Sequence, residues 1–154
     1  MKTPAKKSLS NPKVVKHIAQ LLADTYILYI KTQNFHWNVE DPRFYFLHKM
    51  LEEQYEQLAE AVDVIAERLR GLEERSPGSM KEFLALTTLK EASGKYTGNQ
   101  MIENLLHDHT IIITYLHQFI TEANDSHDDG TADLCIDRIR EHEKTAWILR
   151  SHLK

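Results

Sequence analysis

The chain has 154 residues, of which 42% are hydrophobic, 27% charged and 8% aromatic, with only 5 Gly and 4 Pro. This composition favours one packed domain and excludes disordered, collagen-like and linker architectures. No apolar stretch approaches the roughly 18 residues that a membrane span needs. The N-terminal lysines have no apolar segment behind them, and the lone Cys135 has no partner for an internal disulfide. We therefore expect a cytoplasmic protein that does not associate with membranes.

Charge is distributed unevenly along the chain. The first 16 residues contain five lysines and no acid, which leaves 14 basic against 23 acidic residues in the remainder. An acidic body attracts metal cations, whereas a lysine-containing arm can contact phosphates without a folded DNA-reading motif. Metal ions and nucleic acid both remain open as partners at this point.

Capping signals and apolar residues at helical spacing predict four long helices and one short one. Asn-Pro and Asp-Pro pairs precede the first two helices, Ser79 with Glu82 and Thr97 with Gln100 form capping boxes, and Thr131 is the expected cap of the last helix. The expected helices span residues 12–37, 42–71, 79–84, 98–124 and 132–152.

The order of these helices predicts the fold class. Four long helices, with a short helix inside a long second connection, are typical of an all-α, ferritin-like four-helix bundle with a crossover. We expect residues 1–10 to form a flexible lysine-containing arm and residues 11–154 to form the bundle domain.

Several kinds of chemistry have no signature in this chain. It has no Gly-rich phosphate loop, no H-E-x-x-H pair and no cysteine cluster, so carboxylates and nine histidines remain as candidate ligands for iron, manganese or zinc. A usual di-iron site inside the bundle requires Glu-x-x-His, which is absent, and the first helix supplies only Asp24 as an acid. A metal site would have to lie elsewhere.

The second predicted helix offers an alternative in four residues that share one edge of its apolar face: His48, Glu52, Asp63 and Glu67. At 1.5 Å rise per residue, His48 lies roughly 22 Å from Asp63, too far for one metal ion. A two-fold axis near residues 56–58 would bring the His48 end of one chain to the Asp63 end of another. The alternative is a solvated surface with ordinary i,i+4 contacts, and His36 is either a third ligand or a packed structural residue.

Several segments together carry a resemblance to a known family. KTQNFHWNV at 31–39, FLHKMLEEQY at 46–55, DVIAERLR at 63–70 and Thr131-Ala132-Asp133 are similar to the Dps family, the DNA-binding proteins from starved cells. The resemblance implies a hollow homododecamer that oxidises Fe(II) with hydrogen peroxide, or more slowly with oxygen. It also implies storage of the ferric product inside the shell, which limits hydroxyl-radical damage to DNA.

The resemblance also implies roles for particular residues. His36, His48 and Glu52 of one chain would bind iron together with Asp63 and Glu67 of a partner chain. The family usually has Asp where this chain has Glu52, so the second iron position is expected to shift or bind more weakly. Zinc is a possible adventitious occupant of the same ligands.

Two further sites are implied at the surface. Asp129 and Asp133 would line three-fold pores for iron entry, or would only favour the helix dipole and solvate a turn. Lys2, Lys6 and Lys7 of the arm would contact DNA, or would only solubilise the terminus. A protein that acts chiefly by compacting nucleoid DNA through this arm is the alternative to an iron-oxidising one.

Overall fold

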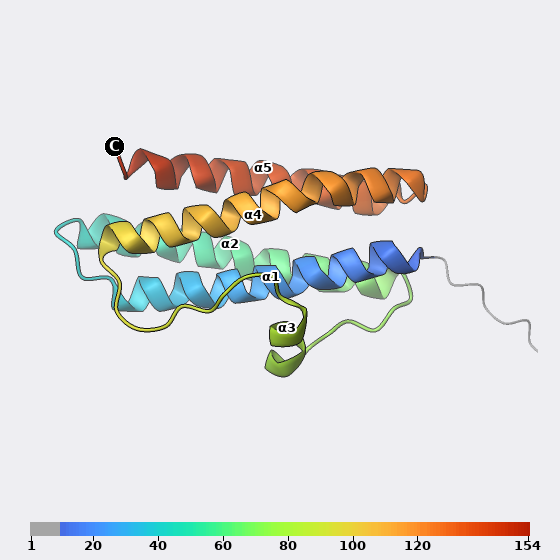
Figure 1. Cartoon of the computed structure of the whole chain (residues 1–154), viewed down its shortest axis with the longest axis horizontal. Coiled ribbons are helices and arrows are strands. Elements are labelled where there is room, and N and C mark those ends of the chain that lie inside the picture. The colour runs from blue at the N-terminus through green and yellow to red at the C-terminus, as the bar shows by residue number, and fades with distance from the viewer. Residues whose placement is uncertain (1–9) are drawn as a thin grey trace, which may run out of the picture.

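The computed structural model describes residues 10–154 and is all-helical over that range. Its elements are α1 (Pro12–Asn38), α2 (Phe44–Gly71), α3 (Met80–Leu86), α4 (Gly98–Asp125) and α5 (Asp129–Ser151). The four long helices form two antiparallel hairpins, α1 with α2 and α4 with α5 (Figure 1). Residues 72–97, which include α3, cross back along the bundle, so α4 runs in the same direction as α2 (Figure 1). The expected ferritin-like crossover bundle is confirmed.

Three of the predicted helix caps are present as expected. The Asn11 side chain accepts a hydrogen bond from the Lys13 amide at 2.9 Å, and Ser79 and Thr97 each form a complete capping box. Each cap satisfies backbone N–H groups that have no partner within the helix. The starts of α1, α3 and α4 therefore follow from local sequence.

Two predicted caps are wrong. Asp41 does not cap α2, which begins at Phe44 after Arg43: its carboxylate accepts hydrogen bonds from the Arg43 amide at 2.8 Å and from the Arg43 guanidinium at 2.9 Å. That contact lowers the pKa of Asp41 to about 2. Likewise Thr131 is not the cap of α5: Asp128 accepts from the Thr131 amide at 3.0 Å, and the helix begins at Asp129.

The apolar faces of the long helices meet in one continuous core. Each fully buried aliphatic side chain contributes about 1.5–3 kcal/mol relative to an exposed one. This core fixes the end of α1 against the start of α2, where the candidate site lies. Its fully buried large side chains include Ile18, Leu28 and Phe35 of α1, Leu58 and Ile65 of α2, and Leu105 and Ile112 of α4.

Two other expectations concern membrane association and the N-terminal arm. None of the described helices is both long enough and apolar enough to cross a membrane. Ser10, expected as the last residue of the arm, is buried, and its hydroxyl donates to Glu74 at 3.2 Å. Lys2, Lys6 and Lys7 lie outside the described residues.

Candidate metal centre

The end of α1 and the first turns of α2 bring His36 and His48 together. The two imidazole rings are stacked, with centroids 3.8 Å apart and an interplanar angle of 14°. Nδ1 of His36 lies 2.8 Å from the backbone oxygen of His48, and Nδ1 of His48 lies 2.8 Å from the backbone oxygen of His36. The sequence placed these residues 12 positions apart, and the turn between the helices makes them neighbours.

This reciprocal contact decides which ring nitrogens carry protons. A carbonyl oxygen only accepts hydrogen bonds, so both Nδ1 atoms must donate. In the neutral imidazoles the Nε2 atoms are then unprotonated, and each has a lone pair available for a metal ion. Histidine ligands in metal sites are commonly held by such a hydrogen bond from the other ring nitrogen.

Aromatic side chains hold the two rings in place. Tyr55 contacts His36 edge-to-face with centroids 5.1 Å apart, and Phe44 stacks on His48 at 5.0 Å. His36 is buried and His48 is half-buried. The imidazole pair is therefore oriented by packing as well as by hydrogen bonds.

Glu52 follows His48 by one helical turn and is half-buried. Its pKa is lowered mainly by a hydrogen bond from Lys49, whose Nζ lies 2.7 Å from Oε2, and further by the proximity of both histidines. Glu52 is therefore a carboxylate at neutral pH. A metal ion would have to displace Lys49, and solvent screening makes such a pair near the surface weak. Sequence reasoning did not identify this competing lysine, although its i,i+3 spacing was visible.

Asp63 and Glu67 lie farther along α2 and are exposed. Within residues 10–154 neither carboxylate has a recorded hydrogen bond or ion pair, and no three His, Cys, Asp or Glu side chains form a metal-binding cluster. The helix rise places Asp63 roughly 22 Å from His48. The structure thus joins His36 and His48, places Glu52 one helical turn after His48, and does not bring Asp63 and Glu67 to them within one chain.

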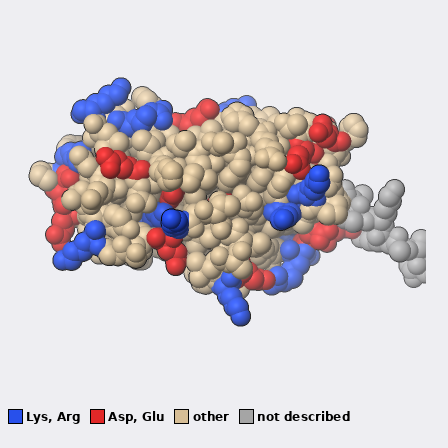
Figure 2. All heavy atoms as spheres, in the orientation of Figure 1, with Lys and Arg blue, Asp and Glu red and all other residues tan. Residues whose placement is uncertain are grey.

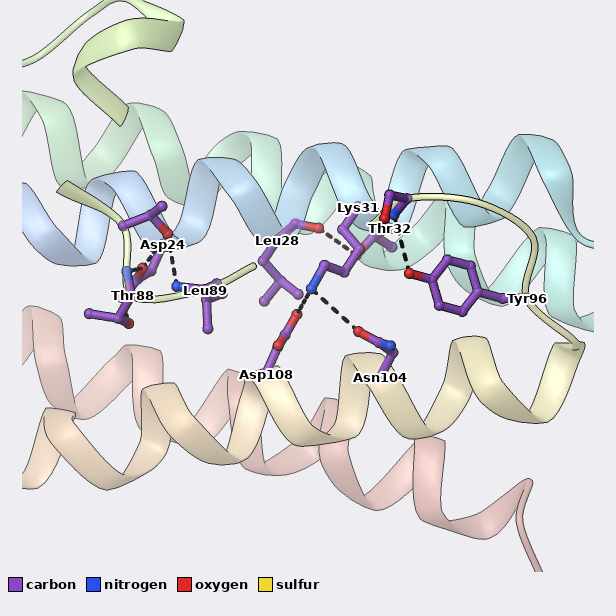
Figure 3. A network of polar contacts seen from close by, with 11 residues as sticks. Asp24, Leu28, Lys31, Thr32, Thr88, Leu89, Tyr96, Asn104 and Asp108 are labelled. Atoms are coloured by element: carbon purple, nitrogen blue, oxygen red, sulfur yellow. Dashed lines mark hydrogen bonds and ion pairs between the residues drawn. The ribbon is translucent and has the colours of Figure 1, made fainter. Parts of the chain in front are cut away.

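The interior of the bundle uses its buried acids for structural contacts (Figure 3). Asp24 accepts hydrogen bonds from the Thr88 amide at 2.6 Å and from the hydroxyls of Thr87 and Thr88 at 2.7 and 2.8 Å. Asp108 forms a 2.6 Å ion pair with Lys31 of α1. Both carboxylates, the only acids buried in residues 10–154, are thus engaged by protein donors.

The remaining seven histidines divide between surface and core. Five are exposed or half-buried, whereas His109 of α4 and His142 of α5 are fully buried and share a 2.8 Å Nδ1–Nδ1 hydrogen bond. His109 falls in the apolar stripe between Leu105 and Ile112, and this position was the signal that it belongs to the core. The pair joins the two helices of the second hairpin.

The acids near the α4–α5 turn have two different environments. Asp128 is held by the start of α5 and by Arg68, whose guanidinium lies 2.6 Å from its carboxylate. Asp129 and Asp133, the predicted pore residues, are exposed on the first turns of α5 and lie one helical turn apart. The arrangement leaves this second pair accessible to solvent.

Comparison with known proteins gives the class. Residues 15–154 match the ferritin-like domain family. The chain is 43% identical over 143 residues to an uncharacterized low temperature-induced protein of Nostoc sp., covering 92% of this chain and 80% of that protein. It is 34% identical to DNA protection during starvation protein 2 of Bacillus anthracis, covering 93% of this chain and 98% of that protein.

Solved structures agree with the sequence comparisons. Dps from Staphylococcus aureus superposes with a TM-score of 0.91 at 35% identity, covering 94% of this chain and 98% of that one. A Vibrio cholerae Dps protein, described as a member of a broad superfamily of ferritin-like diiron-carboxylate proteins, superposes with a TM-score of 0.90 at 28% identity, covering 97% and 100%.

The bundle, its crossover and these matches define a ferritin-like protein. Within that class the chain belongs to the Dps family, which the resemblance at residues 31–70 predicted. Membership links it to iron storage and to DNA protection.

Proposed function

We propose that this protein is a ferroxidase that oxidises Fe(II) with hydrogen peroxide at sites shared between two subunits and stores the ferric product in a hollow homododecamer. The observation that carries the proposal is the reciprocal His36–His48 hydrogen bonding. It leaves two imidazole lone pairs beside the ionised Glu52. Imidazole with carboxylate is a ligand set that suits iron.

One subunit supplies only part of this ligand set. His36, His48 and Glu52 provide two nitrogens and one carboxylate, and Asp63 and Glu67 provide two exposed carboxylates at the far end of the same helix. An antiparallel copy of α2 across a two-fold axis unites the two groups, and a closed dimer then has two equivalent sites. Zinc binds similar nitrogen and oxygen donors and would compete as an adventitious occupant.

The reaction balances with two ferrous ions for each peroxide. Each Fe(II) loses one electron, the O–O bond breaks, and two protons from solvent complete two water molecules, so no hydroxyl radical is released. The carboxylates favour the ferric product because of their negative charge, and the imidazoles hold the ferrous form. Removal of both Fe(II) and peroxide would limit damage to DNA, and oxygen would serve as a slower oxidant.

Complementation between two defective subunits tests the shared site. Asp63→Ala should lose Fe(II) binding although His36 and His48 remain. His48→Ala should also lose it, because an imidazole ligand is missing although Asp63 remains. In a mixed dimer one of the two sites has all its native ligands, so about half of the sites in mixed dimers should recover, which is about a quarter of all sites after random exchange of equal amounts. Calorimetric Fe(II) titration under anaerobic conditions measures the recovery. Mass spectrometry first establishes that the subunits have exchanged. If no sites recover after that exchange, the shared site is contradicted.

A role in DNA compaction is the second candidate, since a relative is named for DNA protection. On the face shown in Figure 2, basic and acidic side chains are interspersed around a largely uncharged centre. The lysines of the arm (Lys2, Lys6 and Lys7), which lie outside the described residues, are the contacts that we propose for phosphates. Deletion of residues 1–9, which keeps the Ser10 contact, should abolish a salt-sensitive gel shift if the arm binds DNA.

A further inference from the structure

Three tyrosines form a row that leads away from the imidazole pair. Tyr55 of α2 contacts His36 with ring centroids 5.1 Å apart, and Tyr29 of α1 contacts Tyr55 at 6.1 Å. Tyr26, one turn earlier on α1, contacts Tyr29 at 5.8 Å. We call Tyr55, Tyr29 and Tyr26 the tyrosine row.

The two-electron reaction described above does not use these rings. Packing alone would be satisfied by phenylalanine, which occupies the position after the row: Phe83 of α3 stacks on Tyr26 with centroids 4.5 Å apart. Phenol differs from phenyl in that it loses one electron and its proton much more readily. The three phenols of the tyrosine row are in contact and can each be oxidised, whereas Phe83 after them resists oxidation. Electron transfer along the row therefore ends at Tyr26.

The surroundings of Tyr55 suit such a path. The carboxylates of Glu52 and Glu56 lie near its phenol. The same negative charges favour loss of an electron from the ring. The next phenol, Tyr29, accepts a hydrogen bond from Gln33 Nε2 at 3.4 Å, which fixes its position.

We propose that the tyrosine row supplies the second electron when peroxide meets a site that holds only one Fe(II). This inference rests on the proposed ferroxidase function. The ferrous ion gives one electron, and Tyr55 gives the other together with its phenolic proton. The O–O bond breaks and, with one further proton from solvent, both oxygens leave as water.

Tyr29 then reduces the Tyr55 radical by giving it an electron and a proton, and Tyr26 reduces the Tyr29 radical in the same way. Each transfer returns the ring behind it to a neutral phenol, so the oxidised centre moves away from the histidine ligands. Tyr26 is half-buried at the α1–α3 contact, where a small-molecule one-electron reductant such as ascorbate can restore it. The row thus prevents a single Fe(II) from releasing hydroxyl radical.

Tyr55→Phe is the direct test because it keeps the ring and removes only the phenol. The wild type, loaded anaerobically with one Fe(II) per site and frozen rapidly after peroxide addition, should give a tyrosyl radical signal by electron paramagnetic resonance. Ring-deuterated tyrosine should narrow that signal. Tyr55→Phe should lose it and release hydroxyl radical to a spin trap.

Two further variants separate the row from general effects. Tyr45→Phe is the matched control: this tyrosine is 67% exposed, and its one recorded ring contact among the described residues is with Phe46. It should leave the signal unchanged, and Tyr29→Phe should confine the radical to Tyr55. A signal that survives in Tyr55→Phe would overturn the row while leaving the ferroxidase proposal intact. A wild type that oxidises no Fe(II) would overturn both.

Discussion

The buried pair of His109 and His142 forms a hydrogen-bonded series whose proton positions can be assigned. The Arg138 guanidinium only donates, so Nε2 of His142, at 3.3 Å, must accept. Nδ1 of His142 then donates to Nδ1 of His109, and Nε2 of His109 carries a proton that has no partner among the described residues. Burial and the Arg138 charge lower the pKa of His109 to about 3. The pKa of His142 is also lowered, by burial and by His109 and Arg138.

These lowered pKa values predict that the protein loses stability as the pH falls. The unfolded chain binds a proton near the ordinary histidine pKa of about 6.5, whereas folded His109 does so only near pH 3. The unfolded state therefore gains protons first, and stability present above pH 6.5 should decrease progressively toward pH 3. The difference corresponds to about 5 kcal/mol at most for His109.

Unfolding by urea at several pH values, followed by circular dichroism, measures this slope. His109→Gln should flatten it because glutamine does not titrate in this range. The exposed His117→Gln serves as the control and should retain the wild-type slope. An equally steep loss of stability in His109→Gln would show that other groups cause the acid sensitivity.

At the scale of helices, the sequence predicted the number, order and approximate limits of the elements because capping and apolar spacing are local signals. The start of α2 was misplaced since Asp41 binds Arg43, and Arg43 in turn donates to the backbone oxygen of His152, 109 positions away. The Lys31–Asp108 ion pair was also not foreseen, since its partners are 77 positions apart. Contacts between distant helices leave no periodic pattern for sequence reasoning to detect.

The crossover offers a prediction at this scale, because the buried Asp24 of α1 accepts three hydrogen bonds from it. Asp24→Asn keeps the shape but removes the charge and one acceptor from the hydrogen bonds with Thr87 and Thr88. We expect a loss of about 2–3 kcal/mol in unfolding free energy. Amide hydrogen exchange should accelerate at residues 87–89 in particular. The exposed Asp137→Asn should cost less than about 0.5 kcal/mol. Unchanged exchange in the crossover of Asp24→Asn would contradict this role.

At the scale of the whole molecule, the site that we propose would require a second chain. The five proposed ligands were predicted from the sequence, and the structure brings two of them, His36 and His48, into contact. Packing between subunits would decide which surface of a partner meets them, and the pattern of residues along α2 indicates only that a two-fold axis would complete the set. A closed shell built on such axes would also separate its interior from solvent, so Fe(II) needs a path inward.

Asp129 and Asp133 are the residues we propose for that path. They are exposed on α5, whereas Asp128 beside them is held by Arg68 and Thr131. Three copies around a symmetry axis would form rings of carboxylates whose field attracts cations. The competing interpretation is that Asp129 only favours the helix dipole, which contributes about 0.3–1 kcal/mol to stability and nothing to iron entry.

The double variant Asp129→Asn/Asp133→Asn distinguishes these interpretations, because it removes the charge and nearly keeps the shape. Stopped-flow measurement at limiting Fe(II) should show slower uptake, with the oligomer intact by light scattering and the Fe(II) affinity of the histidine site unchanged. The matched control, Asp125→Asn/Asp137→Asn, removes the same charge from other exposed positions on α4 and α5. Slowing in the first variant alone assigns the effect to a local field rather than to net charge. Equal rates in the wild type and both variants would exclude Asp129 and Asp133 from iron entry, because a cation passing a carboxylate ring is sensitive to its charge at low salt.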